Sequence, residues 1–270
     1  MPRRSANMEV MVRAALRAAR ALVRDFGEVE QLQVSVKGPA DFVSAADRRA
    51  EQILYEELSR ARPRWGFLME ESGERGEADA EYRWIVDPLD GTTNFLHGMP
   101  HWSISIGLVR GSEILAGLVF DPVKNEMFTA EKGEGAFLND RRIRVSARRD
   151  LGTALIGCGI PVRDWEGRRH FGAQMEAVSD HVAGIRRLGT ASLDLAWVAA
   201  GRLDGFWEFG LKPWDIAAGL LLVQEAGGLS ASLTGQPVLA SGTVVAANPQ
   251  VFDRLRAILL AAEPSRATRG

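Results

Sequence analysis

Residues 84–95 (WIVDPLDGTTNF) constrain this chain more than any other stretch of its sequence. The stretch begins with a short apolar run that contains β-branched residues, which is typical of a buried strand. Because the proline at position 88 cannot donate a hydrogen bond to a neighbouring strand, we expect the strand to end near Asp87. Residues 91–93 (GTT) then predict the start of a helix, with backbone N–H groups that no helical carbonyl satisfies.

Two carboxylates, Asp87 and Asp90, lie beyond the expected strand end, three positions apart. Carboxylate oxygens bind hard cations, and the N-terminus of a helix binds phosphate. The stretch can therefore hold a metal ion together with a phosphate that the ion polarises. The alternative is an ordinary turn, because Asp-Pro and Asp-Gly pairs form turns readily and Asp90 can act as a plain helix cap.

Composition narrows the class of protein. With 270 residues, 46% hydrophobic and 25% charged, the chain fits one large domain or two closely packed halves. A net charge of -2 without a dense basic run argues against a nucleic-acid partner. A single cysteine, Cys158, excludes an internal disulfide framework, and no apolar run approaches the roughly 18 to 20 residues that span a bilayer. We therefore expect a soluble cytoplasmic protein without membrane contact.

The spacing of apolar residues predicts the remaining elements. Helices are expected at residues 8–26, 44–60, within 161–181, and at 191–200, 213–226 and 249–262. Strands are expected at 32–37, 65–69, 83–86, 102–109, 114–120, 126–131, 135–138, 142–145, 154–160, 185–188, 203–209 and 243–246. The strands between positions 102 and 138 predict an antiparallel meander.

Further acidic side chains stand at the ends of these elements. Glu70 leaves the strand at 65–69 as Asp87 leaves its own strand, so adjacent strands would bring the two carboxylates together. Glu208 lies among aromatic residues, where a carboxylate is unexpected unless it has a partner. Asp47 fits a capping box, and Asp215 fits the first turn of a helix. Each has an ordinary structural explanation when it is taken alone.

Four separated segments, taken together, resemble the inositol monophosphatase family. They are residues 70–72 (EES), 87–95 (DPLDGTTNF), 189–191 (GTA) and 214–219 (WDIAAG), with EAGG following at 225–228. The resemblance covers the chain from about position 8 to 262. It implies an α+β fold, a layered α-β-α-β-α sandwich of the sugar phosphatase type with a largely antiparallel first sheet and a smaller second sheet. It also implies one phosphatase domain over residues 1–270, with halves at about 8–147 and 148–263 and a frayed tail at 264–270.

The resemblance implies that activity depends on two to three Mg²⁺ ions and is sensitive to lithium. One ion would be held by Glu70, Asp87 and the backbone carbonyl of Leu89, and a second by Asp87, Asp90 and Asp215. A third, more hydrated ion would depend on Glu70. All of these ligands are oxygens, which suits Mg²⁺. Zn²⁺ is a poor alternative, because the four histidines form no HExxH motif.

The mechanism that the resemblance implies is in-line attack of a metal-activated water on phosphorus, without a phosphoenzyme. Asp47, Thr92 and Glu70 would be the catalytic residues, with Thr92 and Asp47 orienting or deprotonating the water. The backbone amides of Gly91 and Thr92 would bind the phosphate. The alcohol part of the substrate would contact Asp90, Gly189, Thr190, Ala191, Glu208 and Asp215.

Carboxylates around the alcohol part suit vicinal hydroxyl groups, so the expected substrate is a polyol phosphate monoester, above all inositol monophosphate. Other members of such a family hydrolyse histidinol phosphate, fructose bisphosphate or phosphoadenosine phosphate, and histidinol phosphate stays open as an alternative. A more distant alternative is a non-catalytic protein that binds another protein or RNA. The loss of a metal ligand would indicate it, and every ligand type is present here. A homodimer is expected from the resemblance alone.

Overall fold

The structure is a computed structural model that describes residues 4–28, 34–38, 41–77, 79–160 and 165–262. Within these residues lie two large sheets, a two-stranded sheet and eight α-helices. None of these helices combines the length and the apolar character that crossing a bilayer requires. The helices are α1 (Ala6–Phe26), α2 (Ala45–Ala61), α3 (Thr92–Leu96), α4 (Trp165–Ser179), α5 (Ala191–Ala199), α6 (Pro213–Glu225), α7 (Val238–Ser241) and α8 (Phe252–Ala261).

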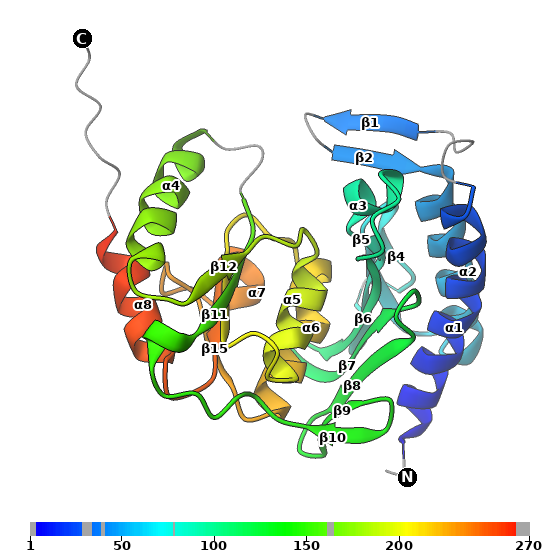
Figure 1. Ribbon diagram of the computed structural model, residues 1–270. Coiled ribbons are helices and arrows are strands. Elements are labelled where there is room, and N and C mark those ends of the chain that lie inside the picture. The colour runs from blue at the N-terminus through cyan, green and yellow to red at the C-terminus, as the bar shows by residue number, and fades with distance from the viewer. Residues whose placement is uncertain (1–3, 29–33, 39–40, 78, 161–164, 263–270) are drawn as a thin grey trace.

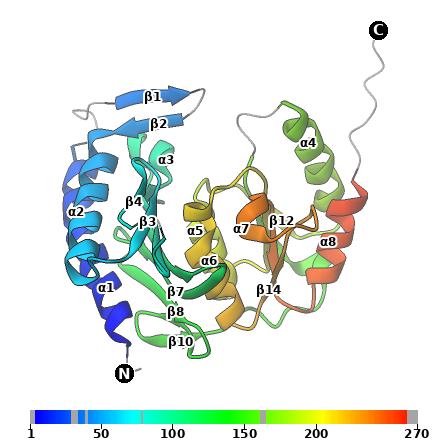
Figure 2. The ribbon, with the colours of Figure 1, turned by 180° about the vertical axis from the view of Figure 1, so that it is seen from behind.

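The elements form five layers (Figure 1). Helices α1 and α2 cover the outer face of the first sheet, and α5 and α6 lie between the two sheets (Figure 1). Helices α4 and α8 cover the far face of the second sheet, and the view from behind shows the same order (Figure 2). The predicted α-β-α-β-α sandwich is therefore confirmed.

The first sheet has eight strands in the order β10-β9-β8-β7-β6-β5-β3-β4. Only β3 and β5 pair in parallel, and every other neighbouring pair is antiparallel, as the predicted meander requires. The strands are β3 (Gly66–Met69), β4 (Gly73–Arg75), β5 (Tyr82–Asp90), β6 (Ser103–Arg110), β7 (Glu113–Asp121), β8 (Glu126–Glu131), β9 (Gly135–Leu138) and β10 (Arg141–Ile143).

The second sheet has five strands in the order β12-β11-β13-β15-β14. Strand β11 pairs in parallel with β12 and β13, whereas β15 is antiparallel to β13 and β14. The strands are β11 (Leu155–Cys158), β12 (Gly184–Arg186), β13 (Gly205–Glu208), β14 (Leu229–Ala231) and β15 (Val244–Ala247). A separate antiparallel pair, β1 (Val34–Gly38) and β2 (Asp41–Ser44), precedes α2.

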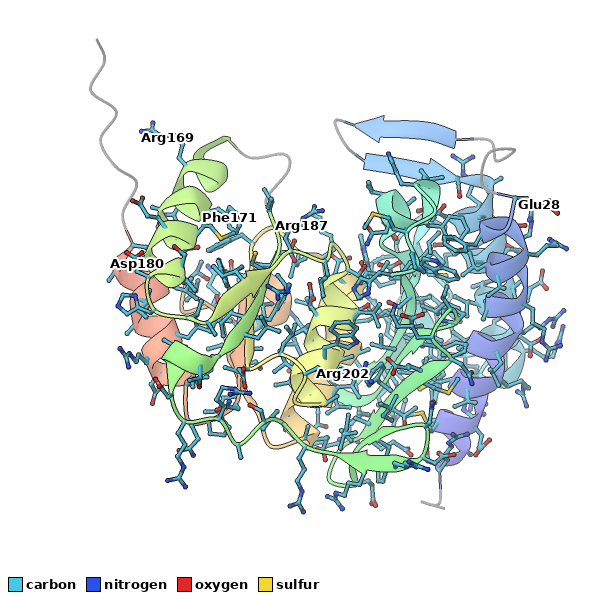
Figure 3. The ribbon with its side chains drawn as sticks, viewed as in Figure 1. Glu28, Arg169, Phe171, Asp180, Arg187 and Arg202 are labelled. Carbon is cyan, nitrogen blue, oxygen red and sulfur yellow. The ribbon has the colours of Figure 1, made fainter. Side chains whose placement is uncertain are left out.

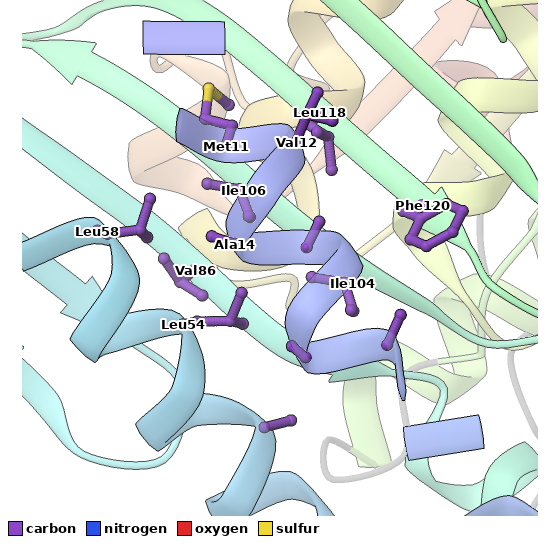
Figure 4. Close-up of a cluster of buried hydrophobic side chains, with 14 of the residues drawn as sticks. Met11, Val12, Ala14, Leu54, Leu58, Val86, Ile104, Ile106, Leu118 and Phe120 are labelled. Atoms are coloured by element: carbon purple, nitrogen blue, oxygen red, sulfur yellow. The ribbon is translucent and has the colours of Figure 1, made fainter. Parts of the chain in front are cut away.

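The core of the first half lies between α1, α2 and the first sheet. Leu54 and Leu58 of α2 and Ala14 of α1 are fully buried against strand residues such as Val86 and Ile106 (Figure 4). The spacing of these helix residues places them on one face, so burying that face provides the main stabilisation of both helices.

Helix α6 lies unusually close to the first sheet because two strand glycines leave room for it. A Cβ added at Gly117 would lie 2.7 Å from the backbone oxygen of Ala218, and one added at Gly107 would lie 3.0 Å from the Cβ of Ala217. The Ser105 hydroxyl of β6 also donates a hydrogen bond to the backbone oxygen of Trp214, at 3.1 Å. The first turn of α6 is therefore held against the ends of β5 and β6.

The expectation that the strand at 83–86 ends near Asp87 is wrong. Strand β5 continues to Asp90 through a bulge, because Asp87 pairs with Ser105 and Asp90 pairs with Ser103. The chain thus advances three positions on β5 but two on β6, and the proline at position 88 lies inside the bulge, where it does not have to donate to the ladder. Ser103 and Ser105 share one face of β6, so the bulge turns both aspartates toward that face.

Other differences are small. Strand β4 was expected to be loop, while β2, β14 and α7 were missed; all four are short and carry no clear periodicity. Strands β11, β12 and β13 are shorter than expected. The first two positions of the strand expected at 32–37, the start of the helix expected within 161–181, and the tail at 264–270 lie outside the described residues. The division into one domain of two halves stays a prediction.

Candidate active site

The carboxyl ends of β3 and β5 bring the first two acidic residues together. Met69 pairs with Val86, and the Glu70 amide donates to the Val86 carbonyl at 3.1 Å, so Glu70, which follows β3, lies beside Asp87 of the adjacent parallel strand β5. The expected convergence of these ends is confirmed. Burial, and then the charges of Glu70, Asp90 and Asp215, raise the pKa of Asp87 well above its usual range, and a hydrogen bond links its side chain to that of Glu70.

Asp90 joins the first sheet to α5. Its carboxylate accepts hydrogen bonds from the Ser192 amide at 2.8 Å and from the Ser192 hydroxyl at 2.6 Å. These groups belong to the first turn of α5, where a negative charge is favourable. Burial raises the pKa of Asp90 to about 6, against the lowering effect of the hydrogen bonds from Ser192 and the Ala191 amide. Sequence reasoning missed Ser192, and its place one residue after the GTA motif is the signal that could have found it.

Asp215 enters the site from the first turn of α6. Its carboxylate accepts a hydrogen bond from the Lys212 amide at 2.7 Å, which caps the helix. Burial, followed by the charge of Asp90, raises the pKa of Asp215 to about 8. Glu70, Asp87, Asp90 and Asp215 therefore form one electrostatically coupled group, which is called the acidic group below.

The acidic group offers only oxygen atoms as metal ligands, and burial raises each of its shifted carboxylate pKa values, together with neighbouring negative charges at Asp87 and Asp215. A hard divalent cation such as Mg²⁺ fits these donors. In the part of the chain that the structure describes, no three histidine, cysteine, aspartate or glutamate side chains already surround a single point closely enough to hold a metal ion. The assignment of ligands to individual ions, including the carbonyl of Leu89, stays a prediction.

Thr92 and Asp47 are in direct contact beside the acidic group. The Thr92 hydroxyl lies 3.0 Å from the Asp47 carboxylate and 3.1 Å from the carbonyl oxygen of Leu89, and it can donate to either. Asp47 also accepts from the amide and the hydroxyl of Ser44, so the predicted capping box is confirmed. Burial raises the pKa of Asp47, although the hydrogen bonds from Ser44 and Thr92 oppose the rise.

The turn after β5 contacts the start of α5. Gly91 has a φ of 95°, and a Cβ there would lie 2.7 Å from the Thr190 hydroxyl. The Asn94 side-chain amide donates to the carbonyl oxygens of His101 and Leu188, both at 2.8 Å, and so ties the two segments together. Sequence reasoning gave Asn94 no role, although its place within the DPLDGTTNF string, two residues after Thr92, is the signal that could have found it. The GTA motif at 189–191 thus lies next to residues 91–94, and its expected contact with the substrate stays a prediction.

Glu208 ends β13 and is only partly exposed. Burial, followed by the charge of Asp90, raises the pKa of Glu208 to about 8, and the charge of Arg187 opposes this rise. Arg187 directly follows β12 (Figure 3). Contacts and charges link most of the residues that the sequence predicted for the site: Asp47, Glu70, Asp87, Leu89, Asp90, Gly91, Thr92, Thr190, Ala191, Glu208 and Asp215. Gly189 adjoins Thr190 in the chain, and the roles of all these residues stay predictions.

Comparison with known proteins extends the likeness over nearly the whole chain. The sequence description of the inositol monophosphatase family matches residues 5–264. The inositol-1-monophosphatase of Mesorhizobium japonicum is 56% identical over 255 residues, which cover 93% of this chain and 94% of that protein. The Nus factor SuhB of Pseudomonas aeruginosa is 46% identical over 257 residues, or 92% of this chain and 95% of that protein. The crystal structure of extragenic suppressor protein suhB from Bartonella henselae has a TM-score of 0.92 and 52% identity, covering 96% of this chain and 100% of that one.

Proposed function

The chain belongs to the inositol monophosphatase family, and on that premise we propose that it hydrolyses inositol monophosphate to inositol and phosphate. The observation that carries the proposal is the acidic group, which draws Glu70, Asp87, Asp90 and Asp215 from three different elements to one place. Carboxylates that are withdrawn from water in proteins are normally paired or bound to metal ions, which supports a cation as the partner of this group.

The proposed cofactor is Mg²⁺, in two to three ions. Glu70, Asp87 and the Leu89 carbonyl would hold one ion, and Asp87, Asp90 and Asp215 would hold a second. Glu70 would support a third, and lithium would inhibit by competing for these sites. When bound, Mg²⁺ supplies positive charge to the phosphate and the leaving oxygen and lowers the pKa of water. The coupled rise in the pKa values of Asp87, Asp90 and Asp215 supports this assignment.

The residues proposed for proton handling are Asp47, Thr92 and Glu70. The Thr92 hydroxyl donates its hydrogen to Asp47 or to Leu89, so its oxygen is available to accept a hydrogen bond from the attacking water. Asp47, held by Ser44, fixes the orientation of Thr92 and can take up a proton. Glu70 lies beside Asp87, is partly exposed, and would orient the water from the other side.

The proposed binding residues form two groups, one for the phosphate and one for the polyol part of the substrate. The amides of Gly91 and Thr92, at the start of α3, would donate to the phosphate oxygens. The carboxylates of Asp90, Glu208 and Asp215 would accept hydrogen bonds from hydroxyl groups of the polyol, which suits an alcohol with several neighbouring hydroxyls. Gly189, Thr190 and Ala191 would line the space between the two parts.

The relative named Nus factor SuhB supports a second candidate function, a role in a transcription complex beside catalysis. We propose the catalytic role first, because the more similar relative is named for its phosphatase activity. The chain is further proposed to form a homodimer, as expected for its family.

The variant Asp90→Asn tests the catalytic proposal. An amide oxygen can still accept from Ser192, so the fold should persist, but the charge that would hold Mg²⁺ is removed. We expect kcat to fall by about two orders of magnitude or more, in the range that loss of one charge-stabilising group produces. Steady-state release of phosphate from inositol 1-phosphate at saturating Mg²⁺ measures the change.

The same assay on histidinol phosphate and fructose bisphosphate tests the substrate. The highest kcat/KM is expected for inositol 1-phosphate, and a higher value for histidinol phosphate would overturn the inositol assignment. Near-normal turnover by Asp90→Asn, with the thermal unfolding curve unchanged, would overturn the assignment of Asp90 as a ligand of the catalytic Mg²⁺, whereas a folded wild-type protein without turnover would favour the binding role.

A further inference from the structure

Gly159 and Glu208 lie side by side where two parallel strands of the second sheet end. Cys158 of β11 pairs with Trp207 of β13, and the Gly159 amide donates to the Trp207 carbonyl at 3.2 Å. The next position on each strand is therefore Gly159 on one and Glu208 on the other. Nothing in the sequence had pointed to Gly159.

The Glu208 carboxylate occupies the place where a side chain at position 159 would begin. A Cβ added to Gly159 would lie 1.8 Å from Cδ of Glu208, and 1.9 and 2.0 Å from its two oxygens. Gly159 is buried, and its φ is not among the positive values of the described glycines. The backbone at this position would therefore accept alanine, and the three atoms nearest to the new Cβ all belong to the Glu208 carboxylate.

The Glu208 carboxylate has charged neighbours, but no hydrogen bond from a described residue fixes its position. Within the described residues, no donor makes a hydrogen bond to this carboxylate, whereas Arg187 attracts it and Asp90 repels it. Asp194 of α5 is fully buried, and its Oδ1 has no hydrogen-bond partner among the described residues. Burial, and then the charge of Glu208, raise the pKa of Asp194. The position of the carboxylate thus depends on the space over Gly159.

We propose that Gly159 is a specificity-determining residue for the polyol part of the substrate. Because it lacks a side chain, it keeps open the space from which the Glu208 carboxylate reaches a hydroxyl group. The inference rests on the proposed function and deepens it, since it assigns polyol recognition to a residue that contacts neither the phosphate nor the acidic group.

The variant Gly159→Ala should fold, because the atoms that a new Cβ meets are the far end of a flexible side chain that can turn away. With the carboxylate displaced, KM for inositol 1-phosphate should rise about tenfold or more, as expected when a charged hydrogen bond is lost. The value of kcat should stay within about threefold, because the lost contact binds ground state and transition state alike. For p-nitrophenyl phosphate, which has no polyol, both constants should stay near the wild-type values.

Two glycines of the same half serve as matched controls. Gly157, two positions earlier on β11, would place its Cβ 2.9 Å from Leu203 and 3.2 Å from Phe206, so Gly157→Ala should lower stability without raising KM selectively. Gly172, exposed on α4, has nothing within 4 Å of its Cβ position, so Gly172→Ala should resemble the wild type.

A double-mutant cycle with Glu208→Ala completes the test. In the Glu208→Ala background the clash is gone, so adding Gly159→Ala should change neither KM nor stability further. Should Gly159→Ala prove unstable, the double variant must be more stable than the single one. Equal rises in KM for both esters, an unchanged KM, or an effect that persists without Glu208 would each overturn the inference. A wild-type enzyme that hydrolyses neither ester in Mg²⁺ would instead refute the proposed function, and the inference with it.

Discussion

At the scale of single residues, His101 shows how neighbours determine a charge state. Its ring lies edge-on to Trp197, with ring centroids 5.2 Å apart, and its Nδ1 lies 3.4 Å from the Lys124 ammonium. Burial and the charge of Lys124 lower the pKa of His101 to about 4, while Asp121 acts in the opposite direction. The ring is therefore neutral at physiological pH, and its backbone carbonyl accepts hydrogen bonds from Asn94 and Thr190 in the site.

This shift predicts a loss of stability in mild acid. Because the pKa of His101 is lower in the folded protein than in the unfolded chain, the unfolded chain takes up the proton first. The contribution of His101 to the free energy of unfolding is constant above about pH 6.5. It falls as the pH drops from there toward 4, by up to roughly 3 kcal/mol. Urea unfolding between pH 7.5 and 4.5 should show a shallower decline for His101→Gln than for the wild type. Parallel declines would contradict the prediction.

Sequence reasoning at this scale found the acidic residues and missed their partners. Asp87 and Glu70 stand at predicted strand ends and Asp90 in the turn that follows, so these positions can be read from the pattern along the chain. Ser192 bonds to Asp90 from 102 positions away, and Gly159 matters only because of the Glu208 side chain. Such roles exist only in the folded contact and leave no local pattern in the sequence.

At the scale of elements, the close packing of α6 against the first sheet determines where Asp215 lies. Gly117→Ala would place a Cβ 2.7 Å from a backbone oxygen of α6, which cannot turn away as a side chain can. Overpacking of this kind costs about 1–3 kcal/mol, and displacement of the helix should lower kcat/KM as well. Gly107→Ala, whose Cβ would lie 3.0 Å from the Cβ of Ala217 and at least 3.7 Å from the backbone of α6, should cost less on both measures.

Chemical unfolding and steady-state assays of the two variants check this order. A Gly117→Ala variant as stable and as active as the wild type would show that α6 has freedom to move. The reverse order of the two variants would show that the close approach at Gly117 is not what positions the helix.

Elements of regular pattern were predictable, and irregular ones were not. The meander from β6 to β9 follows from alternating apolar runs with turn residues between them, and both β8 and β9 have the predicted bounds. The bulge in β5 was missed because a proline signals the end of a strand unless the partner strand tolerates an extra residue. The register between β5 and β6 decides that, and it is a property of the pair.

At the scale of the whole molecule, the acidic group lies where the first sheet meets the helices of the middle layer, and its charge opposes folding. The pKa values of Asp90 and Asp215 rise from 3.8 to about 6 and about 8 on folding. The folded protein therefore retains protons that the unfolded chain has released. The contribution of these bound protons to the free energy of unfolding is fully present below pH 3.8. It is lost as the pH rises through 6 and 8.

Binding of Mg²⁺ should restore the stability that the folded protein loses when these carboxylates ionise. We expect the difference in Tm between samples with Mg²⁺ and with EDTA to be larger at pH 8 than at pH 6, because protons compete with the ion at the lower pH. At about 100-fold excess over Kd the gain is about 2.7 kcal/mol, or about 5 °C for a chain of this size. In Asp90→Asn the difference should shrink, and a difference that does not depend on pH would contradict this account.

The layering itself came from resemblance, because periodicity shows that a helix has an apolar face but not which sheet covers it. Helices α5 and α6 are apolar on nearly every side, which fits their place between two sheets, yet the same pattern suits any buried helix. The order of layers depends on contacts between distant parts of the chain, such as Asn94 with Leu188.

The extra residue in β5 has a consequence for how this protein can change over time. Side chains three positions apart on an even strand face opposite ways, so Asp87 and Asp90 share a side only because of the irregular step between them. A codon gained or lost there would swing one carboxylate into the hydrophobic interior, whatever amino acid it encoded. Among related sequences, the number of residues between Asp87 and Asp90 should therefore vary less than the identities of those residues.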